Sequence, residues 1–537
     1  MPRRLKHLGG GYEDEQPSRD QLRAATTFIS ERLGFGSVEP ERPMPLSAVS
    51  LPAPRLRAPE ALEPICASDD YERALHALGS SYRDVVRAFR GQFEHPPDVV
   101  AHPRDERELE AVLDWALGAG AAVIPFGGGT SVVGGVEPRV DRDRFAGVVT
   151  IDCKTLDRVL EVDPVSQAAR IQAGATGPVL EGQLHEHGLT LRHFPQSFQF
   201  STLGGWIATR AGGHFATLYT HIDDLVESVR AITPAGAWES RRLPGSGAGV
   251  SPDRMLIGSE GALGVITEAW VRVRERPRFR SSRGVRFKTF SAGADAVRAL
   301  SQSGLHPAGC RLIDPDEAKL TGAGDGSHAL LVLGFESAAH QTEPLMALAL
   351  QCCGDQGGVW DPDEGAGSES SRSGSVGSWR EAFLRAPYLR DTFVAMGILS
   401  ETFETAITWE RFPELHRSII ERTTTAVREA CGAGSVTCRF THVYPDGPAA
   451  YYTVLAPVRR GEELEQWALV KRAAGDAVLA GGGTITHHHA IGRDHRDWYD
   501  RQRPDPFAAA LRGAKAAVDP AGALNPGALI DPLPRAV

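Results

Sequence analysis

The sequence predicts an α+β fold of two or three domains that ends in a helical segment. Three observations support this. The length of 537 residues exceeds what a single hydrophobic core usually organises. From Pro97 onward, short apolar runs alternate with helical patterns, and beyond about residue 280 this alternation gives way to longer mixed elements. Glycine-rich loops interrupt the alternating part at four places.

Residues 1–94 are interpreted as an adaptor region. A helix is expected over residues 19–33, because Gly34 stands where a helix would end. A second helix is expected over residues 71–89 from the helical spacing of their apolar side chains. A proline-rich coil separates the two.

Residues 95–277 are predicted to form the alternating domain. The expected strands are 99–101, 122–124, 147–151, 168–173, 223–233 and 264–273, and the expected helices are 106–118 and 178–187. Pro178 suits the first turn of the second helix. Residues 274–277 read as a linker.

Residues 278–480 are predicted to form a separate α+β cap that contributes to a substrate site, and residues 481–537 a C-terminal segment of helices and turns. Within the cap, residues 361–378 are dominated by glycine, serine and acidic residues. Such a composition cannot bury a core, so we expect a disordered surface insertion there.

Composition excludes several classes of protein. The formal net charge of -10 argues against nucleic-acid binding, which requires a basic surface. The 7 cysteines include no C-x-x-C pair, which argues against a zinc site or a disulfide framework and fits a reducing cytoplasm. Neither a signal-peptide pattern nor an apolar run of about 20 residues is present, so a soluble cytoplasmic protein is expected.

The most informative loop is Ile124–Ser131, which contains Gly127-Gly128-Gly129. Consecutive glycines allow positive φ, and successive backbone N–H groups can then surround a pyrophosphate. The spacing fits neither a Rossmann fingerprint nor a P-loop. Three further loops lie at residues 196–206, 209–213 and 258–267. Each alone is explained by a tight turn, but four in one domain suit a long cofactor with a pyrophosphate and two ring ends.

In this order, the four loops resemble the FAD-binding domain of the vanillyl-alcohol oxidase superfamily, also called the PCMH type. The resemblance spans residues 90 to 275 and implies a domain of two subdomains that binds FAD. No histidine stands between Pro125 and Arg139, so non-covalent FAD is expected. The residues that the resemblance assigns to FAD are Pro125, Phe126, Gly127, Gly128, Gly129, Thr130, Ser131, Gln196, Ser197, Ser201, Thr202, Gly205, Thr209, Arg210, Ala211, Gly212, Glu260, Gly261, Ala262, Leu263, Gly264, Val265 and Ile266.

The remaining chain resembles the alkyldihydroxyacetonephosphate synthases. The resemblance rests on segments 481–492, 311–314, 390–391, 401–405 and 409–411. It implies exchange of the acyl group of acyl-dihydroxyacetone phosphate for a long-chain alcohol, which forms an ether-lipid precursor with no net redox change of the FAD. Such lipid substrates imply peripheral contact with a membrane, and the sequence leaves a homodimer open.

The same resemblance assigns catalytic roles to Arg311, Tyr452 and the triplet His487, His488 and His489, and substrate binding to Arg390. Arginine suits a phosphate because its planar fork pairs two oxygens, although an interface salt bridge is the alternative for both arginines. Tyr451 is the alternative to Tyr452, because the family's aromatic run is only partly present and neighbouring strand residues face opposite sides.

In an extended segment, His487 and His489 would share a face and His488 would point away. A metal site is the rival reading of the triplet, but no carboxylate or cysteine stands nearby in the sequence, so no metal is expected.

Two other functions remain open: an FAD-dependent oxidoreductase acting on a 2-hydroxy acid such as D-lactate or glycolate, and a non-catalytic flavin-binding protein. The histidine triplet, Arg390 and residues 401–405 favour the synthase.

Overall fold

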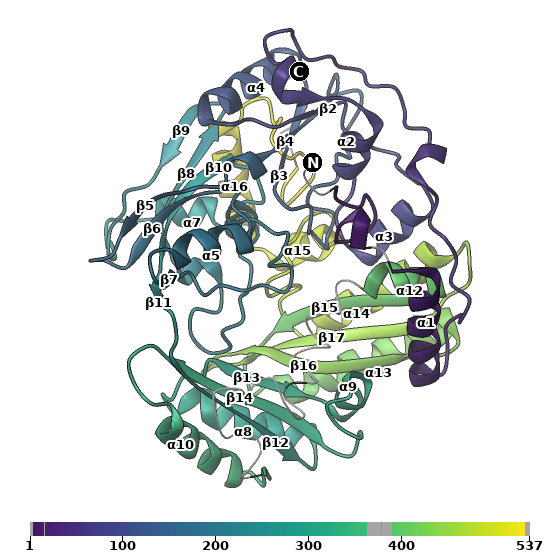
Figure 1. Ribbon diagram of the computed structural model, residues 1–537, viewed down its shortest axis with the longest axis vertical. Coiled ribbons are helices and arrows are strands. Elements are labelled where there is room, and N and C mark those ends of the chain that lie inside the picture. The colour runs from purple at the N-terminus through teal and green to yellow at the C-terminus, as the bar shows by residue number, and fades with distance from the viewer. Residues whose placement is uncertain (1–3, 16, 362–376, 378–388, 532–537) are drawn as a thin grey trace.

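The computed structural model describes residues 4–15, 17–361, 377 and 389–531. The predicted insertion at 361–378 therefore lies outside the described residues except for Asp361 and Gly377. Helices and sheets are mixed along the chain, which confirms the α+β class. Figure 1 shows two sheets in the upper half of the molecule and one larger sheet in the lower half.

The N-terminal region forms helices that its capping residues define. Helix α1 (Arg19–Leu33) begins at a capping box between Ser18 and Gln21 and ends at Gly34, whose φ is 76°. The single helix expected over residues 71–89 is wrong. Asp69 and Ser81 each accept hydrogen bonds from backbone N–H groups, so two helices form, α2 (Asp70–Leu75) and α3 (Tyr82–Phe89).

The first sheet has four strands in the order β1-β2-β4-β3, where β1 is Cys66–Ala67, β2 is Val99–Ala101, β4 is Val148–Asp152 and β3 is Ala122–Phe126. Strands β2, β4 and β3 run parallel, and α4 (Glu106–Gly118) connects β2 to β3. The triple-glycine loop follows the carboxyl end of β3, which is where ligands of parallel sheets bind.

The second sheet is antiparallel, in the order β5-β6-β10-β8-β9. Its core includes apolar side chains of α5 (Gly177–His185) and α6 (Leu203–Thr209). The predicted linker at 274–277 begins with a short strand, β11 (Arg274–Glu275), paired to β7 (Leu189–Thr190). The remaining elements are β5 (Val159–Asp163), β6 (Ala168–Gln172), β8 (Val226–Thr233), β9 (Gly236–Glu239), α7 (Pro252–Leu256) and β10 (Val265–Arg272).

The third sheet has six antiparallel strands in the order β12-β14-β13-β16-β17-β15. Its strands are β12 (Phe279–Phe287), β13 (Gly309–Ile313), β14 (Ala329–Ser337), β15 (Ile398–Ala406), β16 (Ser435–Val443) and β17 (Pro448–Pro457). The helices around it are α8 (Phe290–Gln302), α9 (Pro315–Thr321), α10 (Glu343–Gly354), α12 (Arg390–Met396), α13 (Phe412–Cys431) and α14 (Glu463–Ala480).

Alternation along these strands separates two faces. Cys438, Phe440 and Tyr452 point into a hydrophobic core shared with the helices, whereas their neighbours Arg439 and Tyr451 line a cavity on the other side. The face that carries Arg439 and Tyr451, called the open face below, is therefore turned toward the glycine loops.

After α14 the chain returns to the first sheet through α15 (Arg496–Gln502) and α16 (Asp505–Val518). There Val123 of β3 donates a backbone hydrogen bond to Ala523 and accepts one from Asn525. Short 3₁₀ turns occur at Glu13–Glu15, Leu46–Ala48, Glu63–Ile65, Cys153–Thr155 and Ile222–Asp224. Within the described ranges, no helix has the length and apolar character needed to cross a bilayer.

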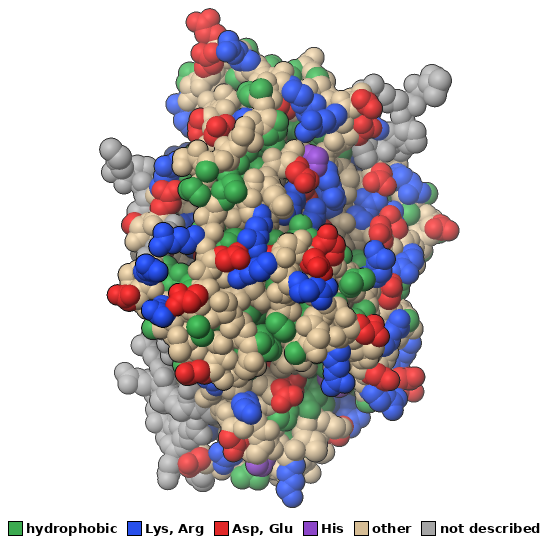
Figure 2. Space-filling view, turned by 90° about the vertical axis from the view of Figure 1, so that its right-hand side faces the viewer, with side chains coloured by type: hydrophobic (Ala, Val, Ile, Leu, Met, Phe, Trp, Pro, Cys, Tyr) green, Lys and Arg blue, Asp and Glu red, His purple; other side chains and the backbone are tan. Residues whose placement is uncertain are grey.

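The surface has no single charge character on the face drawn in Figure 2. Lys and Arg side chains are interspersed there with Asp and Glu side chains, and hydrophobic side chains occur in small groups between them. No extended basic surface is visible on that face, and the net charge of -10 likewise gives no indication of one.

Candidate active site

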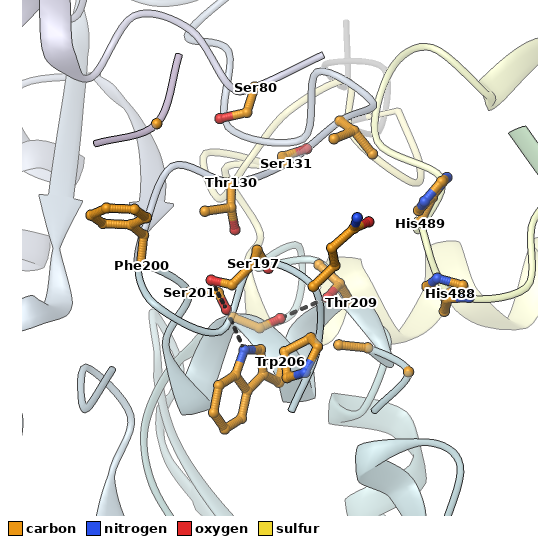
Figure 3. Close-up of a pocket in the computed structure, with 18 of the residues that line it drawn as sticks. Ser80, Thr130, Ser131, Ser197, Phe200, Ser201, Trp206, Thr209, His488 and His489 are labelled. Carbon is orange, nitrogen blue, oxygen red and sulfur yellow. Dashed lines mark hydrogen bonds between the residues drawn. The ribbon is translucent and has the colours of Figure 1, made fainter. Parts of the chain in front are cut away.

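A cavity of about 250 Å³ lies between the glycine loops and the open face of the six-stranded sheet. A second cavity of about 100 Å³ shares Gly127, Ser131, Thr202, Gly205 and Thr209 with the first. The two therefore form one elongated space along the triple-glycine loop. Figure 3 shows the first cavity, with Thr130 and Ser131 above the centre, Trp206 below it and His488 and His489 at one side.

The triple-glycine loop lies so close to its neighbours that side chains are excluded. A Cβ on Gly128 would lie 1.9 Å from the carbonyl oxygen of Phe200, and one on Gly127 would lie 2.3 Å from Oγ1 of Thr202. Gly129 has a φ of 66°, in the left-handed region. The loop consequently presents backbone to the cavity at a position that fits a pyrophosphate group.

Most residues that the sequence predicted for the cofactor line this elongated space. The larger cavity is lined by Gly127, Gly128, Gly129, Thr130, Ser131, Gln196, Ser197, Ser201, Thr202, Gly205, Thr209, Ala211 and Gly212. The smaller cavity adds Pro125, Phe126, Glu260, Gly261, Gly264, Val265 and Ile266. Segments from both upper sheets thus meet around one site.

Three predicted cofactor residues do not line either cavity. Arg210 is 58% exposed at its side chain and pairs with Asp223 at 2.8 Å. Ala262 and Leu263 are fully buried in hydrophobic clusters. Gly261 and Gly264, on either side of Ala262 and Leu263, do line the smaller cavity.

Glu260 joins the smaller cavity to the C-terminal segment. Its carboxylate accepts hydrogen bonds from the backbone N–H groups of Ile491 at 2.8 Å and Gly492 at 2.7 Å. Asn525 donates to the Glu260 carbonyl oxygen at 2.7 Å. Burial raises the pKa of Glu260 to about 7, although the two backbone donors oppose the rise.

The histidine triplet forms a bend rather than an extended segment. His488 and His489 both line the larger cavity, whereas His487 is not among its lining residues. The expected sharing of a face by His487 and His489 is therefore wrong. His487 instead contacts Tyr444, with 2.7 Å between its Nε2 and the hydroxyl oxygen, and its carbonyl oxygen lies 3.0 Å from Nε2 of His221.

Glu404 on β15 holds this bend. Its Oε1 accepts hydrogen bonds from the backbone N–H groups of all three histidines, at 3.1, 2.5 and 2.6 Å, and from the Thr486 hydroxyl at 2.9 Å. Burial opposes ionisation of Glu404, but the adjacent His488 and His489 hold its pKa well below the usual range. The sequence analysis missed this role, since Glu404 lies more than 80 residues before the triplet.

The triplet's neighbours also bear on the alternative of a metal ion. Two overlapping groups have side-chain donor atoms within 4.8 Å of one another: His442, His487 and His488, and Glu404, His488 and His489. Glu404 is therefore close to the triplet in the fold although it is distant from it in the sequence. Oε1 of Glu404 already accepts four hydrogen bonds, so in the second group only Oε2 is left to contact an ion.

Three arginines line the larger cavity: Arg311 on β13, Arg390 at the start of α12, and Arg439 on β16. Arg311 donates to the carbonyl oxygen of His214 at 2.7 Å, and Arg390 donates to the carbonyl oxygen of Ser80. Guanidinium groups at a cavity wall can pair with two oxygens of an anion, so the cavity is suited to an anionic ligand. The sequence analysis did not single out Arg439.

Arg439 is also part of a buried ion pair and stacks on a tyrosine. Its Nη1 lies 2.6 Å from Oε1 of Glu317, and its guanidinium carbon lies 4.0 Å from the centre of the Tyr451 ring. Burial raises the pKa of Tyr451, and the cation over its ring limits the rise.

The structure brings Tyr451 to the cavity and not Tyr452. Tyr452 is fully buried on the opposite face of β17, where its ring stacks on Phe403 at 5.0 Å and its hydroxyl contacts Nδ1 of His416 at 3.1 Å. Neighbouring residues of a strand point to opposite faces, which explains why the predicted Tyr452 lies outside the cavity while Tyr451 lines it.

The N-terminal segment 5–12 covers one side of the cavity. Gly9 and Gly10 are among the lining residues. Lys6 pairs with Asp391 at 2.9 Å, and the Tyr12 ring lies 5.6 Å from that of Phe200. This segment therefore connects the predicted cofactor loop at 196–206 to the residue next to Arg390, a contribution that the sequence analysis did not find.

Two protein families match the chain. The family described as "FAD binding domain" matches residues 97–240, and "FAD linked oxidases, C-terminal domain" matches residues 276–529. The glycine cradle and the elongated cavity fit this cofactor, so the site binds FAD.

Curated relatives are similar over most of the chain. Alkyldihydroxyacetonephosphate synthase of Trypanosoma brucei brucei is 31% identical over 481 residues, which are 86% of this chain and 78% of that protein. The enzyme of the same name from Dictyostelium discoideum is 30% identical, with 86% and 78% covered. A glycolate oxidase subunit of Bacillus subtilis is 25% identical, with 81% and 89% covered.

Among solved structures, too, a synthase is more similar to this chain than an oxidoreductase is. An alkyldihydroxyacetonephosphate synthase structure superposes with a TM-score of 0.81 at 26% identity and covers 97% of this chain and 98% of its own. A p-cresol methylhydroxylase structure has a TM-score of 0.65 at 12% identity, with 95% and 97% covered, and shares the fold.

Proposed function

The chain belongs to the alkyldihydroxyacetonephosphate synthase family, and from this premise we propose that it is an FAD-dependent transferase that replaces the acyl group of acyl-dihydroxyacetone phosphate with a long-chain alcohol. The observation that carries the proposal is one cavity in which the FAD-binding loops meet Arg311, Arg390, Tyr451 and the histidine bend. The product is an ether-lipid precursor.

The cavity supplies groups for each part of this substrate. Arg311 and Arg390 provide cations for the phosphate, in the planar geometry that pairs two oxygens. Phe194, Phe200 and Trp206 provide an apolar wall. Bound FAD supplies the flavin ring that activates the substrate carbon, without net redox change.

The exchange also requires proton transfers. Tyr451, His488 and His489 line the cavity and carry groups that donate or accept protons. We therefore propose Tyr451 in place of Tyr452 as the tyrosine of the reaction. His487 acts behind the cavity wall through its contact with Tyr444.

The proposal extends to the setting of the enzyme. Long-chain alcohols and acylated substrates partition into bilayers, so we propose a cytoplasmic protein in peripheral contact with a membrane surface. We also propose the divisions at residues 94/95, 277/278 and 480/481 as domain boundaries. A homodimer is a hypothesis that light scattering on purified protein would test.

Purified holoprotein should be incubated with palmitoyl-dihydroxyacetone phosphate and hexadecanol. We expect hexadecyl-dihydroxyacetone phosphate and free palmitate in equal amounts, with the flavin oxidised at the start and at the end. Arg390→Ala should abolish product formation, whereas Arg417→Ala, on the exposed surface of α13, should not.

The competing functions predict other results. An oxidoreductase would form no ether product, and D-lactate or glycolate would bleach its flavin. The relatives that are 25–26% identical include proteins named as oxidoreductases, glycolate oxidase or D-lactate dehydrogenase. A flavin-binding protein without catalysis would give neither result.

A further inference from the structure

We propose that Arg439 is a positioning residue for Tyr451: its guanidinium, held by Glu317, lies over the Tyr451 ring and makes the hydroxyl group a better proton donor. The proposal rests on the proposed function, because it explains how the tyrosine of that reaction is prepared. The sequence analysis assigned no role to Arg439 or to Glu317.

Strand pairing places Arg439 beside Tyr451. The two residues are direct partners in the pairing of β16 with β17, so their side chains leave the sheet on the same face at neighbouring positions. Glu404 of β15 is the direct partner of Tyr451 on its other side. Tyr451 therefore stands between a guanidinium and a carboxylate in one row across three strands.

The guanidinium of Arg439 covers the face of the tyrosine ring. Its central carbon lies 4.0 Å from the ring centre, and both side chains line the larger cavity. A cation at this distance is attracted to the aromatic face. It also stabilises the negative charge that develops on the ring when the hydroxyl group loses its proton, because opposite charges attract strongly where water is scarce.

Glu317 fixes the direction of the guanidinium. Its Oε1 lies 2.6 Å from Nη1 of Arg439, and its Oε2 accepts a hydrogen bond from the Thr437 hydroxyl at 3.2 Å. The side chains of Arg439 and Glu317 are only 9% and 4% exposed. A buried carboxylate with two donors has little freedom to turn, so the guanidinium that it binds is held in place.

The position of Glu317 follows from the cap of helix α9. Asp314 is the N-cap residue, and its carboxylate accepts the backbone N–H of Glu317 at 2.7 Å. The same carboxylate accepts the backbone N–H of Cys438, the residue before Arg439. One capping residue thus joins the first turn of α9 to β16 and brings Glu317 to the guanidinium.

Charged and titratable groups from several elements face Tyr451. Arg439 comes from β16, Glu404 from β15 and Arg390 from α12, and the rings of His488 and His489 lie 6.2 and 5.4 Å from the Tyr451 ring, between centres. Burial raises the pKa of Tyr451. Among the charged neighbours Arg439 has the largest effect and lowers this pKa, as Arg390 also does, whereas Glu404 raises it.

The ion pair therefore has two opposite effects on the hydroxyl group. Arg439 favours loss of the proton, and Glu317 weakens this effect because its negative charge opposes the field of the guanidinium at the ring. A general acid transfers its proton more readily as its pKa approaches the working pH. We therefore expect Arg439 to increase the rate of the chemical step more than the affinity for the substrate.

The test compares two variants that break the same ion pair. Glu317→Gln removes the carboxylate and keeps the cation over the ring. The double variant Glu317→Gln with Arg439→Met removes both charges and leaves no unpaired charge in the core. The matched control is Glu401→Gln with Lys471→Met, because this pair is buried to a similar extent, at 7% and 8% exposure, on the opposite face of β15.

The direct measurement is the acidity of the side chain at position 451 in the holoprotein. 3-Fluorotyrosine is inserted at that position alone, and its ¹⁹F NMR signal is followed as a function of pH. Fluorine lowers the pKa of a phenol, so the titration falls where the protein remains folded. We expect this pKa to be lower in Glu317→Gln than in the unmodified protein, to be higher by about 1 in the double variant, and to be unchanged in the control.

Shifts in the same direction in both variants, or no shift in either, overturn the proposal, because a disturbed fold does not distinguish loss of the anion from loss of the cation. If the double variant fails to fold, Glu317→Gln alone remains decisive: a higher pKa overturns the proposal and a lower one supports it.

The kinetic measurement separates positioning from substrate binding. We expect kcat of the double variant to fall about tenfold, with KM changed less than about threefold, and kcat of Glu317→Gln not to fall. A higher KM with unchanged kcat would show that Arg439 binds the substrate phosphate instead, and would overturn the proposal. Failure of the unmodified enzyme to form ether product would refute the proposed function and leave the titration result standing.

Discussion

Adjacent tyrosines on β17 occupy opposite environments. Tyr451 lies in the cavity beneath the Arg439 guanidinium, and Tyr452 lies in the core between Phe403 and His416. The two residues are neighbours in the chain, but one side chain lines a polar cavity and the other lies in the hydrophobic core. This contrast lets a pair of identical substitutions separate a catalytic hydroxyl from a structural one.

Tyr451→Phe and Tyr452→Phe should have different effects. Loss of the Tyr451 hydroxyl removes a proton-transferring group, so we expect kcat to fall by about 100-fold with the free energy of unfolding little changed. Loss of the Tyr452 hydroxyl removes one buried hydrogen bond to His416, worth about 1 kcal/mol of unfolding free energy, with activity retained. Steady-state kinetics and urea unfolding measure both. Equal kinetic defects in the two variants would contradict the assignment.

Gly128 is the residue at which the cofactor cradle is most easily blocked. The added Cβ of Gly128→Ala would lie 1.9 Å from a backbone oxygen, so the loop must move. We expect the dissociation constant for FAD to rise more than about tenfold, as measured by flavin fluorescence titration of protein stripped of FAD.

Gly118→Ala is the matched control, since a Cβ there meets no atom within 4 Å, and it should bind FAD as the unmodified protein does. Acid precipitation of either protein should release all flavin into solution, as non-covalent binding requires. Flavin retained in the precipitate would contradict that expectation.

At the scale of elements, the sequence predicted those features that depend on residues close together in the chain, such as helix ends and glycine loops. Helix α1 was predicted at both ends, because Gly34 stops it through its own φ of 76°. The break between α2 and α3 was missed although Ser81 caps the second helix, since the apolar spacing continues through it. The cradle loop was predicted because glycine is required there by close backbone approach.

Tertiary contacts account for what the sequence did not predict. The roles of Glu404 and Arg439 depend on strand pairing between distant segments, which no local spacing records. The same holds for the N-terminal segment 5–12, in which Gly9 and Gly10 line the cavity and Lys6 and Tyr12, on either side of them, contact residues distant in the sequence.

The N-terminal segment should loosen when its ion pair is removed. Lys6 and Asp391 are only 14% and 24% exposed at their side chains, so Lys6→Met should cost about 1 kcal/mol of local stability. Hydrogen exchange followed by mass spectrometry should show amides of residues 5–12 exchanging about fivefold faster. Lys288→Met, at an exposed position, should leave that exchange unchanged. Equal exchange in both variants would show that the pair does not hold the segment.

At the scale of the whole molecule, buried histidines are concentrated around the cavity and in the adjoining core. Burial lowers the pKa of His193 and His489 to about 3 and of His214 and His416 to about 4. The same cause lowers the pKa of four others, His221, His442, His487 and His495. These side chains are neutral in the folded protein near pH 7.

Stability should therefore fall as the pH drops below about 6.5. Between the unfolded pKa of about 6.5 and the lowered folded values, the unfolded chain binds more protons, and each such proton contributes up to about 1.4 kcal/mol per pH unit. Five groups whose pKa is raised in the folded protein act in the opposite direction, but they are fewer than the eight histidines: Glu260 and Asp314, raised to about 7, Asp84, raised to about 6, and His102 and Asp494. Thermal unfolding at pH 7.5, 6 and 5 should show a steady decrease in Tm. A Tm that is constant over this range would contradict the histidine assignment.

The cavity wall is assembled from both ends of the chain. Gly9 and Gly10 come from the beginning, and His488, His489 and Asn525 come from the last tenth of the sequence. During synthesis on a ribosome, the glycine cradle emerges long before the C-terminal residues that complete its surroundings. The cavity wall is therefore complete only after residues 488–525 have emerged, and a chain terminated before His488 lacks part of that wall.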